Sequence, residues 1–141
     1  MIRLRGHHLL CLLSFSGEGY SPEFTRRFGV LAEAYREGKV RVQVLASPDD
    51  ACAACPFLGD AGCRSPADGP EAGVAALDQA VLDALGIEVG IHEAEDLLRR
   101  VATLSGSELH RLCRACSWYG KTRCQAMIRE ESGRLTGGRT D

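Results

Sequence analysis

Residues 52–63 read CAACPFLGDAGC, and residues 113–124 repeat the same cysteine pattern as CRACSWYGKTRC. Both stretches fit Cys-x-Ala-Cys-x-aromatic-apolar-Gly-x-x-x-Cys, and the second begins 61 residues after the first. The chain has seven cysteines in 141 residues, so two copies of a three-cysteine pattern are improbable by chance. The repeat therefore predicts a fold that is organised around cysteine chemistry.

The spacing within each copy suits a metal centre. Two cysteines in Cys-x-x-Cys can turn both sulfurs toward one centre, and the glycine four residues later lets the backbone reverse and return a third sulfur. Three thiolates from one short loop suit an iron–sulfur cluster or a zinc ion. The candidate ligands of the two loops are Cys52, Cys55, Cys63, Cys113, Cys116 and Cys124.

Further ligands are needed if each loop forms a four-ligand site. The N-terminal stretch RLRGHHLLCLL, residues 3–13, contains the one remaining cysteine, Cys11, together with His7 and His8. Residues three or four apart share a helix face, so either histidine can lie beside Cys11. His110, three residues before Cys113, is another candidate. Each of these histidines alone also suits a structural role, so the fourth ligand of each site stays open.

The cysteines allow other arrangements. The two Cys-x-x-Cys pairs could bind one metal together, which would leave Cys63 and Cys124 without a metal. A dithiol redox centre is a further alternative, although it needs no third cysteine. The Cys55-Pro56 step and the long spacing to Cys63 favour a cluster over a compact zinc knuckle. We expect an iron–sulfur cluster, [4Fe–4S], in one or two copies, with zinc as the alternative.

Composition limits the classes of protein. Apolar residues make up 45% of the chain, which is enough for a packed core, and aromatic residues only 6%, which suits a helical core of Leu, Val and Ala. No apolar run approaches the 18 residues of a membrane span. An odd number of cysteines and a short N-terminal apolar run without a cleavage site predict a cytoplasmic protein with reduced thiols.

Charge is unevenly distributed along the chain. Residues 1–46 carry +3, residues 47–98 carry −10 and residues 99–141 carry +5, which sum to the net charge of −2. No aromatic-rich binding module accompanies the basic segments. We therefore expect a redox or protein partner, and neither a nucleic acid nor a membrane.

Local signals predict mainly helices. Periodicity, caps and glycine stops predict helices over 22–37, 71–85, 93–103, from 105 onward and over 121–134, and alternation predicts strands over 40–45 and 87–91. Residues 6–15 fit a buried helix or strand. Residues 46–72 fit a long irregular loop, where Asp49 and Asp50 can accept backbone amides. The fold class is mainly α with one or two short β-strands, a single domain over 1–141 around cysteine-ligated metal, with a fraying tail over 135–141.

Three segments resemble a known family. They are the stretch 3–13, GYSPEF at 19–24 and PDDAC at 48–52. With the six motif cysteines they make the chain similar to the short bacterial and archaeal proteins classed as domain of unknown function 1284, which have been suggested to bind iron–sulfur. The resemblance covers nearly the whole chain. It implies a role for His7, His8, Cys11 and the motif cysteines, and it implies no particular activity.

These observations give one leading hypothesis. The chain binds an iron–sulfur cluster through the repeated loops and Cys11, and acts in electron transfer, redox sensing or cluster-stabilised partner binding. The alternative is a zinc-stabilised protein or nucleic-acid interaction module. Because seven cysteines leave an eighth thiolate missing, an enzyme with an open iron site that acts as a Lewis acid stays a third hypothesis.

Overall fold

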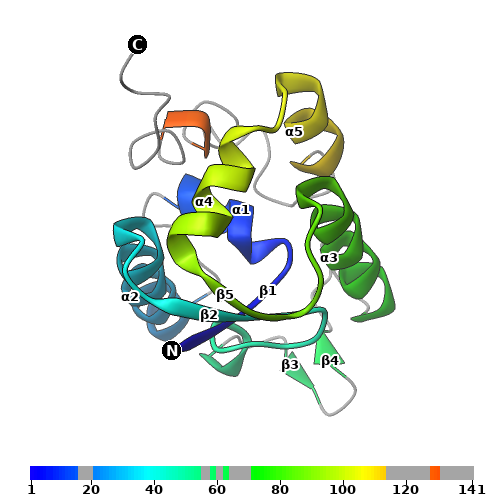
Figure 1. Cartoon of the computed structure of the whole chain (residues 1–141). Coiled ribbons are helices and arrows are strands. Elements are labelled where there is room, and N and C mark those ends of the chain that lie inside the picture. The colour runs from blue at the N-terminus through cyan, green and yellow to red at the C-terminus, as the bar shows by residue number, and fades with distance from the viewer. Residues whose placement is uncertain (16–20, 55–57, 60–61, 64–70, 114–127, 131–141) are drawn as a thin grey trace.

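The computed structural model in Figure 1 describes residues 1–15, 21–54, 58–59, 62–63, 71–113 and 128–130. In chain order, the elements are β1 (Ile2–Arg5), α1 (His8–Ser14), α2 (Pro22–Glu37), β2 (Arg41–Leu45), the 3₁₀ turn η1 (Cys52–Ala54), β3 (Leu58–Gly59), β4 (Gly62–Cys63), α3 (Glu71–Leu85), β5 (Gly90–Glu93), α4 (Ala94–Ala102) and α5 (Gly106–Cys113). The chain is mainly helical, as the sequence predicts.

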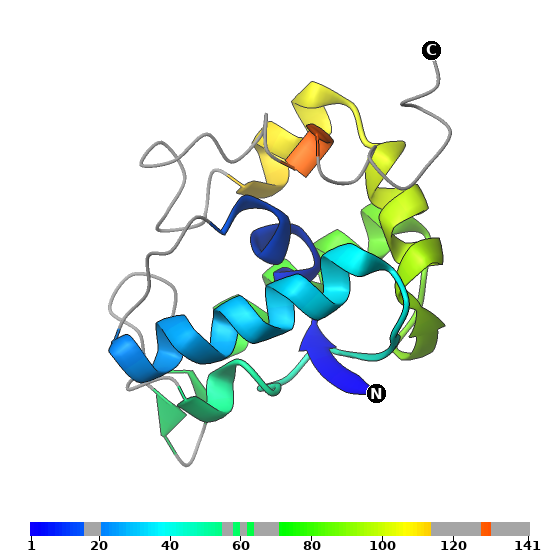
Figure 2. The same cartoon turned by 90° about the vertical axis from the view of Figure 1, so that its left-hand side faces the viewer.

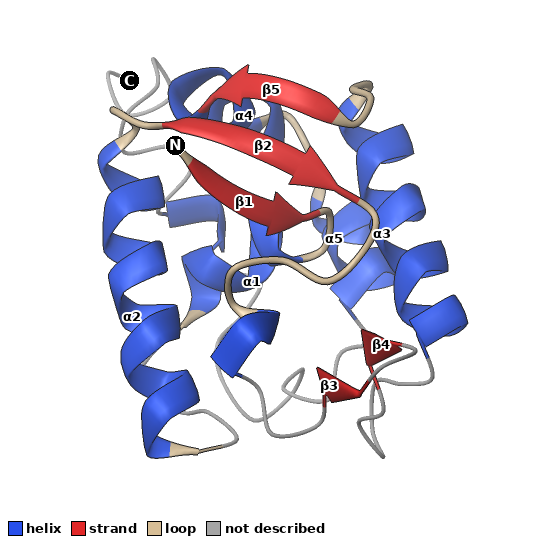
Figure 3. Ribbon diagram, turned by 90° about the horizontal axis from the view of Figure 1, so that it is seen from below, coloured by secondary structure: helices blue, strands red, loops and turns tan. Residues whose placement is uncertain are grey.

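A three-stranded sheet with the order β1-β2-β5 forms one layer. β1 and β2 are parallel, and β5 is antiparallel to β2. A parallel pair needs a crossover connection, which α1 and α2 provide. Leu4, Val42 and Val44 are buried between the sheet and the helices, which lie together on one face of the sheet (Figure 3).

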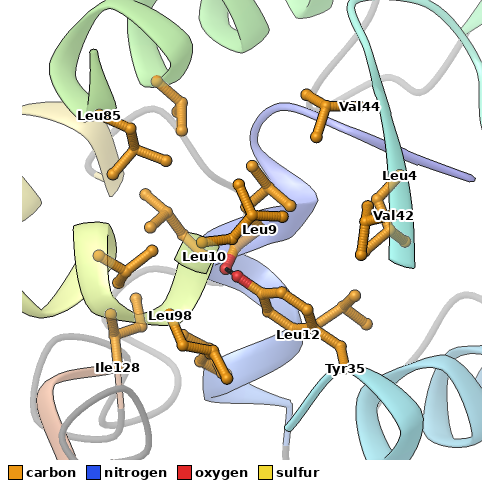
Figure 4. Packing of buried hydrophobic residues seen from close by; sticks show 14 of the residues in the cluster. Leu4, Leu9, Leu10, Leu12, Tyr35, Val42, Val44, Leu85, Leu98 and Ile128 are labelled. Carbon is orange, nitrogen blue, oxygen red and sulfur yellow. Dashed lines mark hydrogen bonds between the residues drawn. The ribbon is translucent and has the colours of Figure 1, made fainter. Parts of the chain in front are cut away.

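The second layer is built around α1. Leu9, Leu10, Leu12 and Leu13 of this helix are all buried, because α1 is covered on nearly every side and α2 packs alongside it (Figure 2). The Tyr35 hydroxyl of α2 donates a hydrogen bond of 3.0 Å to the Leu9 carbonyl oxygen (Figure 4). The sheet and all five α-helices contribute to one hydrophobic core, which makes the described residues a single small domain.

The predicted helix limits are confirmed where a local cap sets them. The Ser21 hydroxyl accepts the Phe24 N–H, and Gly38 ends α2 in the left-handed region with φ 73°. Ser105 and Glu108 exchange hydrogen bonds in a capping box that starts α5. The helices predicted over 71–85 and 93–103 are confirmed as α3 and α4.

The strand predicted over 40–45 is confirmed as β2, and the other strand predictions need correction. A sheet of three strands and the separate two-stranded hairpin of β3 and β4 replace the predicted one or two strands. β1 was not predicted, since its pairing with β2 is a contact across about 40 residues of sequence. The strand predicted over 87–91 begins later, at Gly90, as β5. The alternating apolar residues do not mark a buried strand face here, because the side chains of Val89 and Ile91 are 57% and 58% exposed.

Two other predictions are only partly covered by the described residues. The segment 46–72 is not wholly irregular, because η1 and the β3–β4 hairpin lie within it. Residues 128–130 of the helix predicted over 121–134 are helical, with Ile128 in the core, and the rest of that range and the tail 135–141 lie outside the described residues.

Gly6 brings the turn between β1 and α1 against the backbone of α3. A Cβ at Gly6 would lie 2.5 Å from the Asp78 carbonyl oxygen and 2.9 Å from its Cα. Both atoms belong to a helix backbone and cannot move aside without shifting α3. A glycine is therefore required here for the close approach.

We expect Gly6→Ala to lower the free energy of unfolding by about 1–3 kcal/mol, because the added methyl group overpacks this contact. Gly73→Ala is the matched control. A Cβ at Gly73, on an exposed part of α3, would meet none of the described atoms within 4 Å, so this change should raise stability by up to about 1 kcal/mol. Urea denaturation measures both values, and equal effects of the two substitutions would contradict the close approach.

Candidate metal centre

The candidate site lies where the two parallel strands end. His7 and His8 follow β1, and Asp49 and Cys52 follow β2. The carboxyl ends of parallel strands meet at the same edge of a sheet, which is where α/β folds place their ligands. The two loops therefore bring together residues that are more than 40 positions apart.

Asp49 holds the first histidine. Its Oδ2 lies 2.7 Å from both the Nδ1 of His8 and the backbone nitrogen of Arg5, while its Oδ1 accepts the N–H groups of Ala51 and Cys52 at 2.9 and 3.0 Å. Burial by itself would raise the pKa of this carboxyl group, but His8 and the amide hydrogen bonds lower that pKa well below its usual range. Asp49 is therefore ionised, and the His8 Nδ1–H is the donor.

Asp78 of α3 holds the second histidine in the same way. Its Oδ1 lies 2.7 Å from the Nδ1 of His7 and accepts the His7 backbone N–H at 2.9 Å. Burial, followed by the adjacent His8, lowers the pKa of His7, so its imidazole is neutral at pH 7. The two rings lie side by side with their centroids 4.4 Å apart.

The two aspartates thus set the tautomers of the two histidines. An imidazole that donates from Nδ1 presents the lone pair of Nε2, which is the form that binds metals. Metal-ligating histidines usually donate their other ring N–H to a carboxylate or a carbonyl in this manner. The arrangement can therefore offer two oriented nitrogen ligands.

Cys52 adds a sulfur to this group. Candidate ligand atoms of His8, Asp49 and Cys52 all lie within 4.8 Å of one another. Asp49 already accepts four hydrogen bonds, which is the full capacity of a carboxylate, so we assign it a positioning role rather than a bond to the metal. Burial and the charge of Asp49 raise the pKa of the Cys52 thiol to about 12, so a metal ion would have to displace its proton.

Arg5 connects this group to α3. Its side chain is 1% exposed, and its Nε donates to Asp78 at 2.7 Å while its two terminal nitrogens donate to Glu71 at 3.1 and 2.5 Å. Nη1 also lies 3.8 Å from the Cys52 sulfur. Burial alone would lower the pKa of Arg5, but Glu71 and Asp78 raise it above its ordinary value, so the guanidinium stays charged.

The structure brings together some of the predicted ligands. His8 and Cys52 meet, and His7 lies beside His8. The remaining candidates are distributed as follows: Cys11 lies half-buried on α1, Cys63 pairs with Leu58 in the hairpin, Cys113 is the last residue of α5, and His110 is on the exposed side of α5. Cys55, Cys116 and Cys124 lie outside the described residues.

Sequence reasoning found part of the site. It predicted that Asp49 accepts loop amides, which is confirmed, whereas Asp50 accepts the backbone N–H of Arg3 in β1 and pairs with the Arg3 side chain. It missed Arg5, Glu71 and Asp78. One signal was present for Asp78, which occupies the apolar face of α3 between Val74 and Val81 and is 0% exposed. An acidic residue in such a position needs a buried partner.

Asp49→Asn should lower the free energy of unfolding by about 1–3 kcal/mol, because an amide nitrogen would replace an oxygen that accepts two buried hydrogen bonds. Asp50→Asn is the matched control, since Asp50 bonds the exposed Arg3 through its backbone N–H and its side chain, and it should cost less than about 1 kcal/mol. Chemical denaturation of both variants tests this difference. A loss for Asp50→Asn as large as that for Asp49→Asn would rule out the anchoring role of Asp49.

Comparison with known proteins identifies the family. The model described as "Protein of unknown function (DUF1284)" matches residues 19–122, which is well over half of the chain. No curated protein and no solved structure matches. None of the described helices is long and apolar enough to cross a membrane. The resemblance inferred from the sequence motifs is confirmed, and the chain belongs to the DUF1284 family of proteins of unknown function.

Proposed function

We propose that this chain is an iron–sulfur protein that carries a [4Fe–4S] cluster at the carboxyl ends of β1 and β2. The observation that supports the proposal most is the proximity of the Asp49-held His8 to the Cys52 thiol, with the Asp78-held His7 beside His8. Oriented nitrogen and sulfur donors of this kind suit a transition metal.

The charges of the site support a bound cation. Asp49 and Asp78 are 3% and 0% exposed, and burial of an ionised carboxylate is costly unless a positive charge balances it. Asp78 contacts the Arg5 guanidinium, and Asp49 pairs with the His8 imidazole and accepts three backbone N–H groups. A metal bound to the far nitrogen of His8 would place further positive charge next to these two buried carboxylates.

The repeated cysteine loop favours a cluster over a single ion. Cys52 opens η1, and Cys63 lies in the hairpin that follows, so the described backbone of this loop turns back on itself between them. The second loop starts at Cys113, at the end of α5. We propose that Cys11 and the six motif cysteines provide the thiolates and that His7 and His8 complete the set.

A structural zinc ion is the second candidate. Candidate ligand atoms of His8 and Cys52 lie within 4.8 Å of each other, and nitrogen and sulfur are the ligands typical of a tetrahedral zinc ion. In that case the chain would be a zinc-stabilised module that binds a protein or a nucleic acid. A bound iron–sulfur cluster would supply one-electron chemistry, and on this basis we propose a cytoplasmic role in electron transfer, redox sensing or partner binding.

The metal content of the protein distinguishes the two candidates. Purified without oxygen, the chain should be brown and contain several irons and acid-labile sulfide, because thiolates in a reducing environment retain a cluster. Iron, zinc and sulfide analysis measures this outcome. A colourless protein with one zinc per chain would replace the cluster with the zinc site, and a folded protein with neither metal would contradict the proposal.

His8→Ala should lower metal affinity at least about 10-fold. Loss of an outer-shell partner already lowers affinity by about 10- to 100-fold, and loss of a ligand should lower it further. His92→Ala is the matched control, since the His92 ring on β5 contacts the Glu88 carbonyl oxygen and should leave the affinity unchanged. Metal retention against a chelator, with circular dichroism as a check on folding, measures both. A folded His8→Ala variant with native affinity would remove His8 from the ligand set.

A further inference from the structure

We infer that Arg5 is the residue that positions the first cysteine loop for metal binding. The inference rests on the proposed metal function and adds to it a guanidinium that is not itself a ligand. Arg5 would orient the Cys52 sulfur, stabilise its negative charge once metal is bound, and fix both ends of the loop 52–63.

The first support is the geometry of the guanidinium. Arg5 is 1% exposed, and its nitrogens are directed to three acceptors: Asp78, Glu71 and the Cys52 sulfur. The two carboxylates, both from α3, fix the plane of the group. With Nε bonded to Asp78 and the terminal nitrogens to Glu71, Nη1 is held 3.8 Å from the sulfur.

The second support is the contact of Glu71 with the far end of the loop. A Cβ at Gly62 would lie 2.6 Å from the Glu71 Cγ and 2.8 Å from its Cβ, so the hairpin packs directly on this side chain. Gly62 precedes Cys63 in β4. The Arg5–Glu71 pair therefore contacts the loop at Cys52, where it begins, and at Gly62, next to its last cysteine.

The third support is the charge that Cys52 would acquire on binding a metal ion, which the Arg5 guanidinium can stabilise. When Cys52 binds a metal ion, its S–H bond breaks, the proton leaves to solvent and the sulfur electron pair forms the bond to the metal. A charge-assisted hydrogen bond to the thiolate stabilises the bound state. Lysine could not reproduce this role, because its ammonium group lacks the planar arrangement of donors that reaches three acceptors at once.

The test compares Arg5→Lys with the native chain after anaerobic reconstitution with iron and sulfide, and in parallel with zinc alone. We expect a 10- to 100-fold loss of metal affinity in a chelator titration, as for other outer-shell partners. We also expect a lower reduction potential of the cluster, since hydrogen bonds to sulfur raise it. Loss of stability alone would not cause this second change.

Arg100→Lys is the matched control. The Arg100 guanidinium donates to the Leu85 and Gly86 carbonyl oxygens at the end of α3, and its replacement should leave both measurements unchanged. Glu71→Gln is a milder variant that keeps Arg5, and it should give a smaller loss of affinity if Arg5→Lys does not fold.

The outcomes separate the two proposals. If the native chain binds neither iron nor zinc, the proposed function fails and this inference fails with it. If the native chain binds metal and a folded Arg5→Lys binds it as tightly with an unchanged potential, the inference about Arg5 is overturned while the metal function stands. Equal effects of Arg5→Lys and Arg100→Lys would overturn it as well.

Discussion

The buried carboxylate of Asp78 is the constraint on which the rest of the site depends. It accepts hydrogen bonds from the Arg5 side chain and from both the backbone and the ring of His7. Its backbone also touches Gly6, so the whole turn after β1 is held against α3 at one residue. Removing one partner of such a buried pair costs about 3–5 kcal/mol, because the other charge is left without compensation. The contacts of Asp78 therefore stabilise the fold and also orient the residues of the site.

Asp49 completes the arrangement from the β2 side. It is bonded to the Arg5 backbone and His8 on one oxygen and to two loop amides on the other. The two aspartates thus fix the rings of neighbouring histidines before any ligand arrives. Because the rings are already ordered, metal binding would cause a smaller loss of conformational entropy.

The apolar core and the polar site occupy different parts of the same small domain. α1 carries both, since its first residue is His8 and its interior consists of leucines packed under the sheet. The core fixes the position of α1, and α1 in turn fixes the imidazole of His8. Substitutions in the leucine cluster can therefore change the geometry of the site without touching a polar atom.

Local signals in the sequence predicted the parts of the fold that local interactions form. Ser21 and Gly38 set the limits of α2, and Ser105 with Glu108 starts α5, because each cap bonds within a few residues of itself. The capping role of Asp49 was found for the same reason: the amides that it accepts lie two and three residues away. The cysteine repeat indicated metal chemistry by spacing alone.

Contacts between distant residues decided the rest. β1 exists because it pairs with β2, and Asp78 meets His7 across 71 positions of sequence. The position of Asp78 on the apolar face of α3 indicates a buried acid, but neither pairing can be read from nearby sequence, since the partner lies far away in the chain. The sequence by itself indicated the residues that we propose as metal ligands, because cysteine spacing is a local pattern. Tertiary structure determined that His7, His8 and Cys52 share one edge of the sheet and that Arg5, Asp49 and Asp78 hold them there.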